Sequence, residues 1–308
     1  MRQVWSIAGG EESSGAGSSG PHRGLFVVDL DGTLLTSQRR LAARDREALE
    51  RLRVGGYLVA VATGRSNYSF QRLLVQLACL DGEARLPLDY VIFSTGAGIM
   101  AYPDSQLLQS FGLHPLEVAT ISRYLQGLGL DFMVHAPVPE TRQFLYHGPA
   151  GDNPDFSSRL DQYQDCAAPF SSQALIELGG ATEVLCIVPQ DRGHEVAAHL
   201  GERFSGFSVI KATSPLDGAS VWIEIFPPQV SKSRAVQWLA RRCRVAAADI
   251  CAVGNDYNDL DLLRWAESSF MVANGPPALL DLFETVSSND QGGVAEAAER
   301  WLCTRGGG

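Results

Sequence analysis

Two aspartates, Asp29 and Asp31, close an apolar run in the segment GLFVVDLDGTLL, residues 24–35. Because alternate residues of a strand project to the same face, we expect both carboxylates on one side of the strand end. Two like charges this close repel each other unless a cation or a shared proton relieves them. A simple Asp-Gly turn needs only one aspartate, so the pair indicates a metal-dependent reaction centre.

A threonine and a glycine end a second apolar run, in the segment VATGR, residues 61–65. Thr63 offers a hydroxyl and Gly64 a backbone N–H at the start of an expected helix, and together these groups suit an anion. The same two residues could instead only cap that helix. Anion binding is the favoured interpretation because this strand is expected to neighbour the first one.

Lys232 stands at the head of another expected helix, in the segment PPQVSKSRAV, residues 227–236. The helix dipole favours anions at that end, so a lysine there is electrostatically unfavourable. The chain has 23 arginines but only two lysines, Lys211 and Lys232. Chance placement stays open, but the bias towards arginine favours a position that requires a compact ammonium.

Hard oxygen ligands are dense in the segment VGNDYNDLDLL, residues 253–263. One aspartate or asparagine at a helix start is an ordinary cap, but here three acids and two amides fall within seven residues. Such ligands suit Mg²⁺, which takes one or two carboxylates together with waters and substrate phosphate. The segment therefore indicates a second part of a metal site, with Asn255, Asp256, Asn258 and Asp259 as its candidates.

The elements that must position these residues alternate between strands and helices. Apolar runs at 24–30, 57–63 and 89–94 alternate with helical patterns at 42–54 and 66–79. The alternation resumes with a helix at 231–244, a strand at 249–254, a helix at 258–265 and a strand at 269–273. This order predicts an α/β fold with a Rossmann-like parallel sheet and helices on both faces, whose ligands bind beyond the carboxyl ends of the strands.

The middle of the chain, residues 99–226, has a different texture and is expected to form an α+β insert. Strands are expected at 131–136, 143–147, 182–188 and 207–212, and helices at 116–128 and 191–204. The segment VWIEIF, which carries Trp222 and Glu224, is assigned to a strand that returns to the core. The predicted domains are a core of residues 24–98 and 227–303 around this insert, with a flexible Gly/Ser-rich leader at 1–23 and a tail at 304–308.

Composition limits the class of protein. The chain has 308 residues, of which 45% are hydrophobic and 19% charged, so a packed core is expected. A net charge of −10 argues against binding to nucleic acid. The six cysteines show no paired spacing, which fits reduced thiols in a cytoplasmic protein. No membrane span or signal pattern is apparent, and oligomeric state cannot be read from the sequence.

Taken together, DLDGTLL, the threonine at the next strand end, the helix-opening lysine and GNDYNDLDLL resemble the haloacid dehalogenase superfamily. More narrowly, the chain resembles its Cof-type sugar-phosphate phosphatases of subclass IIB, from about residue 24 to residue 303. The resemblance implies a Mg²⁺-dependent phosphoric monoester hydrolase that acts on a small phosphorylated metabolite. It also implies that the insert at 99–226 is a cap over the active site.

The resemblance implies a role for each matching residue. Asp29 would attack phosphorus to form an aspartyl phosphate, and Asp31 would protonate the leaving oxygen and later take a proton from water. Thr63, the Gly64 backbone and Lys232 would hold the phosphoryl oxygens. Mg²⁺ would bridge Asp29, the backbone carbonyl of Asp31 and the segment that follows residue 254.

The fourth motif departs from the family pattern. Family members commonly read Gly-Asp-x-x-Asn-Asp, whereas this chain has Asn255 at the first acidic position and a carboxylate one residue later, at Asp256. Either residue could be the metal ligand, and Asn258 and Asp259 would support the site through water or by orienting the lysine. Thr95 is a second departure, because the family often has asparagine there.

Alternative functions stay open. A narrower phosphatase for mannosyl-3-phosphoglycerate or sucrose phosphate, or a phosphomutase, would share the same chemistry. The amide at Asn255 leaves room for a catalytically weak ligand-binding protein, and the paired acids alone are also typical of glycosyltransferases. Arg142, His147 and Arg159 are candidate substrate contacts in the insert, and we expect the cap to open and close over the substrate.

Overall fold

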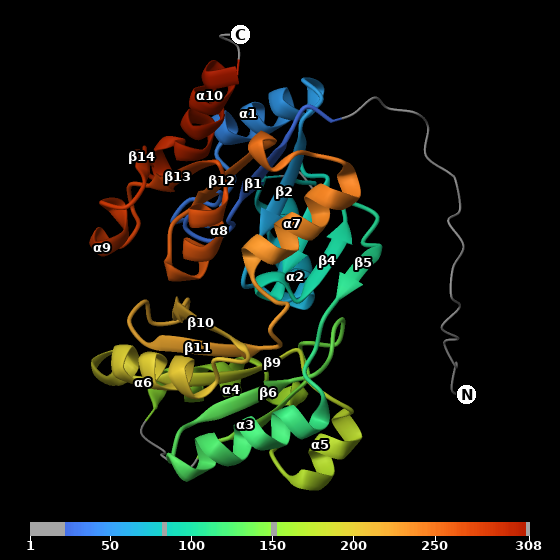
Figure 1. Cartoon of the computed structure of the whole chain (residues 1–308), viewed down its shortest axis with the longest axis vertical. Coiled ribbons are helices and arrows are strands. Elements are labelled where there is room, and N and C mark those ends of the chain that lie inside the picture. The colour runs from blue at the N-terminus through green and yellow to red at the C-terminus, as the bar shows by residue number, and fades with distance from the viewer. Residues whose placement is uncertain (1–21, 82–84, 149–152, 306–308) are drawn as a thin grey trace.

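The structure, a computed structural model, describes residues 22–81, 85–148 and 153–305. Its first sheet has eight strands within these residues, six of them parallel, with β4 and β5 added antiparallel at one edge (Figure 1). In spatial order the strands are β14 (Glu284–Val286), β13 (Ser268–Val272), β12 (Ile250–Gly254), β1 (Leu25–Val28), β2 (Leu58–Ala62), β3 (Tyr90–Phe93), β4 (Gly98–Ala101) and β5 (Leu107–Ser110).

Helices cover both faces of this sheet, as the sequence predicts. Strand β1 shows why, because Phe26 and Val28 pack into one hydrophobic cluster while Leu25 and Val27 pack into another on the opposite face. The first face carries α1 (Ala43–Val54), α2 (Asn67–Asp81) and α10 (Gly293–Arg305). The second carries α7 (Lys232–Cys243), α8 (Leu260–Trp265) and α9 (Pro277–Leu280).

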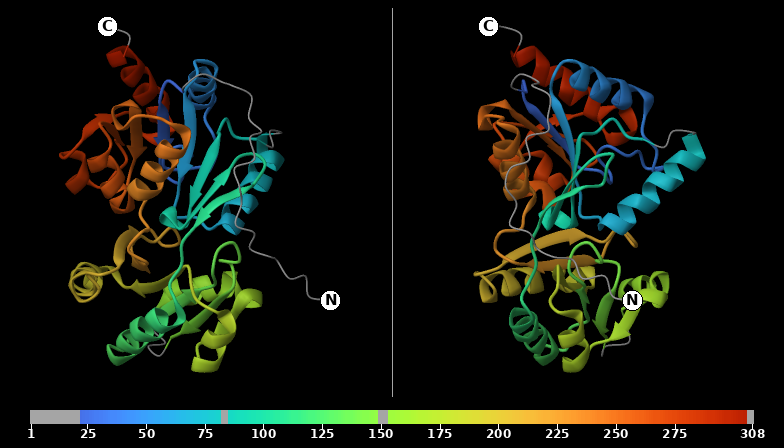
Figure 2. Two further views of the ribbon diagram at one scale, coloured as in Figure 1. Left: turned by 45° about the vertical axis from the view of Figure 1, so that its right-hand side comes forward. Right: turned by 90° about the vertical axis from the view of Figure 1, so that its right-hand side faces the viewer.

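A second, mostly antiparallel sheet has six strands within the described residues. In spatial order these are β10 (Ser208–Thr213), β11 (Val221–Phe226), β9 (Glu183–Val188), β6 (Phe132–His135), β7 (Phe144–His147) and β8 (Ala167–Pro169). Helices α3 (Pro115–Gly127), α5 (Ser172–Leu178) and α6 (Gln190–Arg203) pack on one face. Helix α4 (Pro154–Gln162) packs on the other, which faces the first sheet (Figure 2).

Two expectations about the insert are wrong. The predicted start at residue 99 falls inside β4, and both β4 and β5 pair with the first sheet. Each of these strands pairs antiparallel with the strand just before it in the chain, so the first sheet continues past residue 99 as a local meander. The segment 221–226 was expected to return to the core, but as β11 it pairs with β9 and β10 in the second sheet.

The described residues begin at His22 and end at Arg305. The expected leader, residues 1–23, lies outside the described residues apart from His22 and Arg23. The expected tail at 304–308 begins inside α10, which continues to Arg305. None of the helices in the described part of the chain combines the length and the apolar character that crossing a membrane requires.

Candidate active site

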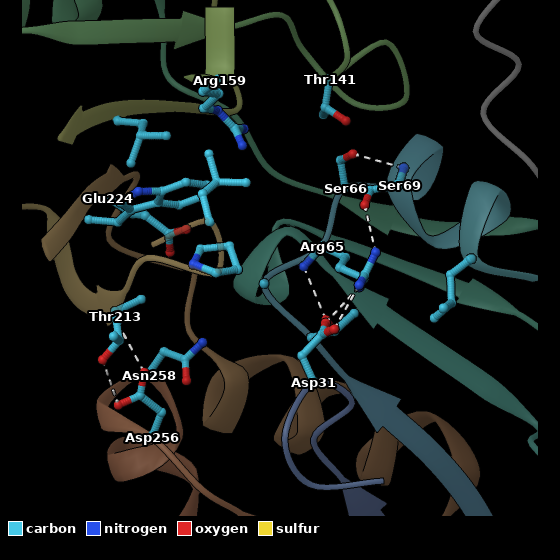
Figure 3. Close-up of a pocket in the computed structure, with 18 of the residues that line it drawn as sticks. Asp31, Arg65, Ser66, Ser69, Thr141, Arg159, Thr213, Glu224, Asp256 and Asn258 are labelled. Carbon is cyan, nitrogen blue, oxygen red and sulfur yellow. Dashed lines mark hydrogen bonds and ion pairs between the residues drawn. The ribbon is translucent and has the colours of Figure 1, made fainter. Parts of the chain in front are cut away.

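A pocket of about 410 Å³ lies between the carboxyl ends of the first sheet's strands and the inner face of the second sheet (Figure 3). Asp29 and Asp31 line it directly after β1, and Thr63 and Gly64 line it after β2. Asn255, Asp256 and Asn258 line it after β12. Parallel pairing of β1 with both β2 and β12 brings these three strand ends together.

Lys232 joins two acidic residues beneath the pocket floor. Its Nζ donates hydrogen bonds to Asp29 Oδ1 at 2.7 Å and to Asp259 Oδ1 at 2.5 Å. The lysine and Asp259 are fully buried, and Asp29 is 5% exposed. The lysine opens α7, which Ser231 caps by accepting a hydrogen bond from the Arg234 N–H at 3.2 Å. The ammonium thus lies behind the pocket wall and acts on the pocket through its hydrogen bond to Asp29.

Burial and neighbouring charges perturb this group strongly. Burial, followed by repulsion from Asp259, raises the pKa of Asp29 to about 7, against the opposing effect of Lys232. The pKa of Lys232 is raised above its ordinary value because the two carboxylates outweigh the effect of burial. The ammonium therefore stays charged, and its charge opposes the protonation of Asp29 that burial favours.

Asp31 faces the pocket and is held by a residue to which the sequence analysis gave no role. Arg65 donates from Nε to Asp31 Oδ2 at 2.6 Å and from Nη2 to Asp31 Oδ1 at 2.7 Å, as Figure 3 shows. Its Nη1 also donates to Ser69 Oγ on α2 at 3.0 Å. Such a bidentate pair fixes the orientation of the carboxylate. Its place directly after Thr63 and Gly64 was the available signal for Arg65.

Asn255 sits where oxygen atoms of the first motif converge. In one amide orientation its Oδ1 accepts from Thr33 Oγ1 at 3.1 Å. In the other, its side-chain nitrogen donates to Asp29 Oδ2 at 3.2 Å, Asp31 O at 3.3 Å and Thr33 Oγ1 at 3.1 Å. Gly32, with φ +75°, makes this approach possible, because a Cβ there would lie 2.6 Å from the Asn255 amide nitrogen.

Asp256 points away from this convergence and towards the second sheet. Its carboxylate accepts from the Thr213 backbone N–H at 3.0 Å and from Thr213 Oγ1 at 3.3 Å (Figure 3). Asp259 instead organises the loop, because its Oδ2 accepts from the backbone N–H groups of Asn255 at 2.9 Å and Asp256 at 3.1 Å. Gly254 leaves room for it, since a Cβ there would lie 2.6 Å from Asp259 Cγ.

The Thr63 turn and Asn258 complete the floor of the pocket. Thr63 Oγ1 accepts from the Arg65 N–H at 3.1 Å, so its hydroxyl proton is available to a ligand. Ser66 Oγ accepts from the Ser69 N–H at 3.2 Å in the geometry of a helix cap. A Cβ at Gly64 would lie 3.6 Å from Asn258 Nδ2, so Asn258 extends over this turn.

Residues of the second sheet and α4 form the opposite wall. Of the three expected substrate contacts, Arg159 lines the pocket. Arg142 is exposed and lies over the Tyr68 ring, and the His147 ring packs near Phe132. His135, Thr141 and Glu183 also line this wall and were not predicted to, and Trp222 and Glu224 line it although their strand was expected to return to the core. Strand alternation in β6, β9 and β11 was the available signal.

Two absences concern metal binding and disulfides. No group of three or more His, Cys, Asp or Glu side chains within the described residues is placed to hold a metal ion. The oxygens that converge near Asn255 belong to one carboxylate, one backbone carbonyl and one amide. Only the carboxylate belongs to a His, Cys, Asp or Glu side chain, so these oxygens do not form a group of that kind. All six cysteines fall in the described ranges and are free.

Comparison with known proteins establishes the family. A model of haloacid dehalogenase-like hydrolases matches residues 26–297, so the chain belongs to this family. This match confirms the predicted superfamily. The phosphatase names of several relatives agree with the predicted enzyme class, a phosphoric monoester hydrolase.

Three similar proteins illustrate the range of relatives. The chain is 25% identical to 5-amino-6-(5-phospho-D-ribitylamino)uracil phosphatase YwtE of Bacillus subtilis over 90% of its own length and 97% of that protein. It is 26% identical to HMP-PP phosphatase of Cronobacter sakazakii over 83% and 86%. The solved structure of BT4131, a HAD subclass IIB sugar phosphatase, superposes with a TM-score of 0.68 at 14% identity, covering 91% of this chain and 99% of that one. That likeness shows the fold.

Proposed function

We propose that this protein is a magnesium-dependent phosphatase that hydrolyses a small phosphorylated metabolite through an aspartyl phosphate on Asp29. The observation that carries the proposal is the charge arrangement at Asp29. One carboxylate oxygen is bonded to the buried Lys232 ammonium, and the other lies 3.2 Å from the Asn255 side chain. The wall of the pocket opposite Asp29 belongs to the second sheet, which we propose as the cap inserted after β5.

The residues present fit a magnesium ion. With the Asn255 amide oriented so that its oxygen faces inwards, that oxygen meets Asp29 Oδ2 and Asp31 O, and acceptors that face one another call for a cation. Asp29, the Asp31 backbone carbonyl and Asn255 would hold the ion. Bound there, it would neutralise charge on the phosphate and the nucleophile. Asp256 is committed to Thr213 and would not be a ligand in this arrangement.

In the first step, an Asp29 oxygen forms a bond to phosphorus while the bond from phosphorus to the leaving alcohol oxygen breaks. Asp31 donates a proton to that oxygen. Arg65 donates one hydrogen bond to each oxygen of Asp31, so the proton that Asp31 carries would sit on one of the remaining lone-pair sites. The Thr63 hydroxyl and the Gly64 N–H are proposed to donate hydrogen bonds to the transferring phosphoryl oxygens.

In the second step, water attacks the phosphorus of the aspartyl phosphate. Asp31 takes a proton from that water, the bond from Asp29 to phosphorus breaks, and inorganic phosphate leaves. Lys232 stabilises the Asp29 carboxylate that is released, through its 2.7 Å hydrogen bond. The cap wall covers the intermediate and limits the entry of bulk water.

A second candidate is a ligand-binding protein with little catalytic activity. The Asn255 amide favours it, because in its other orientation the side-chain nitrogen donates to Asp29 Oδ2 and Asp31 O and so takes the place of a cation. This candidate predicts that phosphorylated ligands bind but release no phosphate.

The test is phosphate release from a panel of sugar phosphates and phenyl phosphate, with Mg²⁺ and with a chelator. We expect turnover that requires Mg²⁺ and is lost in Asp29→Asn, which preserves the shape of the side chain. The matched control is Asp281→Asn at an exposed residue far from the pocket, which should retain activity. Binding of phosphorylated ligands to the wild-type protein without any phosphate release would favour the second candidate.

A further inference from the structure

A second cavity, of about 540 Å³, adjoins the catalytic pocket and has no place in the proposed chemistry. One wall is formed by residues 207–211, which enter β10, the edge strand of the second sheet. The other wall comes from α7, α8 and the turn η4 (Tyr257–Asp259) of the first sheet's side. Figure 1 shows β10 beneath these two helices. We call the space between residues 207–211 and these helices the edge cavity.

Three basic side chains line the edge cavity. Lys211 comes from β10, Arg234 from α7 and Arg264 from α8. Among the described residues that line it, Asp261 is the one acid, and its Oδ2 already accepts from the Ser233 N–H at 3.1 Å. The cavity therefore carries an excess of positive charge, although the chain as a whole has a net charge of −10.

These cations lack bonded carboxylates in the described part of the chain. Arg234 and Arg264 are exposed, and their guanidinium groups form no hydrogen bond or ion pair there. Lys211 Nζ lies 3.2 Å from a ring nitrogen, His194 Nδ1. Burial lowers the pKa of Lys211, and the charge of Asp256 opposes this shift without overcoming it. An anion in the cavity would supply the negative charge that all three cations lack.

The free edge of β10 adds backbone donors to the same wall. The Thr213 N–H donates to Asp256 Oδ2 at 3.0 Å, so it points away from the neighbouring strand β11. Residues of an antiparallel strand alternate in this respect, so the N–H groups of Lys211 and Val209 also point outwards. Both residues line the edge cavity. A carboxylate thus already binds this strand edge, and the next two outward donors along it face the cavity.

The spacing of these donors indicates what kind of anion fits. Residues two apart along a strand are about 6.8 Å apart, so two such N–H groups can each bind one oxyanion group of a ligand that carries two. The guanidinium groups of Arg234 and Arg264 add donors on the facing wall. Hydrogen bonds from charged donors to carboxylate or phosphate oxygens are among the strongest in proteins.

We propose that the edge cavity binds a small metabolite with two or more oxyanion groups, carboxylate or phosphate, which bridges the second sheet to α7 and α8. Its oxygens accept from Lys211 and the edge of β10 on one side and from Arg234 and Arg264 on the other. The ligand is a regulator and not a substrate, because none of the residues proposed to transfer the phosphoryl group lines this cavity.

The two walls connect this binding to the catalytic pocket. They belong to different sheets, so a ligand that contacts both favours the arrangement in which the sheets lie close together. Asn258 lines the edge cavity and the catalytic pocket alike. Ligands in the two spaces should therefore strengthen each other's binding. This effect on turnover rests on the proposed phosphatase function, whereas binding to the edge cavity does not.

Isothermal titration calorimetry in metal-free buffer tests the site with three probes. They are tricarballylate, which has three carboxylates, propane-1,3-bisphosphonate, whose phosphonates resist hydrolysis, and uncharged glycerol. At least one of the anions is expected to bind with a Kd of about 1 mM or lower, and glycerol is expected not to bind. The tighter anion identifies the oxyanion as carboxylate or phosphate. Binding should weaken as NaCl is raised.

Two variants locate the bound anion. Arg234→Met and Arg264→Met each remove one exposed cation, and each should weaken binding roughly tenfold. Arg123→Met, at an exposed position of α3 outside the edge cavity, is the matched control and should bind as the wild type does. Absence of binding by both anions, or wild-type affinity in both cavity variants, would overturn the proposal.

Turnover of phenyl phosphate at a fixed concentration of free Mg²⁺ tests the bridging role. At an anion concentration equal to its Kd, kcat is expected to fall roughly twofold or more and KM to fall with it, because the anion binds more tightly once substrate is bound and slows the separation of the walls. Arg234→Met should lose this effect. A rise in KM with kcat unchanged would place the anion in the catalytic pocket and overturn the proposal, as would unchanged kinetics at saturation.

Failure of the phosphatase would give a different result. A wild-type protein that releases no phosphate from any ester, yet binds an anion through Arg234 and Arg264, would refute the proposed function and support the edge cavity as a binding site.

Discussion

Replacing Lys232 with methionine removes the ammonium that joins two buried carboxylates. In the native protein this ammonium donates to Asp29 at 2.7 Å and to Asp259 at 2.5 Å. Methionine has a similar length and fills the same space, so the variant isolates the effect of charge. The two acids are then left facing each other without the group that attracted both.

The expected loss of stability follows from this burial. Asp29 and Asp259 are 5% and 0% exposed, so water cannot replace the lost donor. A hydrogen bond to a charged group contributes about 1.5–3 kcal/mol, and removing one partner of a buried ion pair costs about 3–5 kcal/mol. We expect the free energy of unfolding to fall by about 3–5 kcal/mol in metal-free buffer.

Urea unfolding at pH 8 with a chelator is the assay. Lys211→Met is the matched control, because the chain's other lysine lies 3.5 Å from the Tyr257 ring centroid at a partly exposed site. Its loss should cost at most about 1 kcal/mol. The double variant Lys232→Met/Asp259→Asn should recover part of the stability, because it removes one of the two unpaired acids.

Two results would refute this reasoning about Lys232. One is a loss below about 1 kcal/mol, similar to that of the Lys211 control. The other is a double variant less stable than Lys232→Met alone, which would mean that Asp259 matters through its loop contacts and not through the shared charge.

Three further predictions concern pH, packing and metal binding. Because burial raises the folded-state pKa of Glu224 to about 7, the stability linked to its proton is present below about pH 4.5 and is lost as pH rises through about 7. Glu224→Gln should therefore be more stable than wild type at pH 8, by at most about 3 kcal/mol in thermal or urea unfolding. The exposed control Glu202→Gln should follow the pH profile of the wild type. A profile of Glu224→Gln that runs parallel to both would contradict this prediction. Trp301 is 1% exposed and its Nε1 has no hydrogen-bond partner. Urea unfolding should therefore show that the free energy of unfolding falls by about 3–5 kcal/mol in Trp301→Ala but by at most about 2 kcal/mol in Trp301→Phe. Equal losses in the two variants would show that the indole nitrogen matters. Asn255→Asp should bind Mg²⁺ at least about tenfold more tightly by calorimetry, with Asp256→Asn as a control of unchanged affinity, and the reverse order would assign the ligand to Asp256.

Much of the site could be predicted because parallel strands end at one edge. Asp29, Thr63 and Asn255 follow strands that pair side by side, so their places in the sequence were enough to bring them together. The lysine could be found for a different reason, since composition made it conspicuous among the arginines. Local patterns therefore sufficed wherever a residue's role depends on its position at a strand end or a helix start.

Side-chain partners across long distances could not be predicted. Asp256 bonds to Thr213, 43 residues away, and Arg65 bonds to Asp31, 34 residues away, and both contacts depend on how the second sheet and α2 settle on the core. The half-buried position of Arg159 likewise depends on how α4 packs on the inner face of the second sheet. No helix was predicted at 154–162, and the polar residues around Arg159 are equally typical of a solvent-exposed arginine.

The most direct test of the central claim is to trap the covalent intermediate. Enzyme mixed with a turned-over phosphate ester and Mg²⁺ would be quenched in acid within milliseconds and analysed by peptide mass spectrometry, with Asp29→Asn as the control. The proposed mechanism predicts one phosphoryl group on the peptide that contains residues 24–35, located on Asp29 and absent from the control. Rapid turnover without any phosphorylated peptide, or a phosphoryl group on another residue, would contradict it.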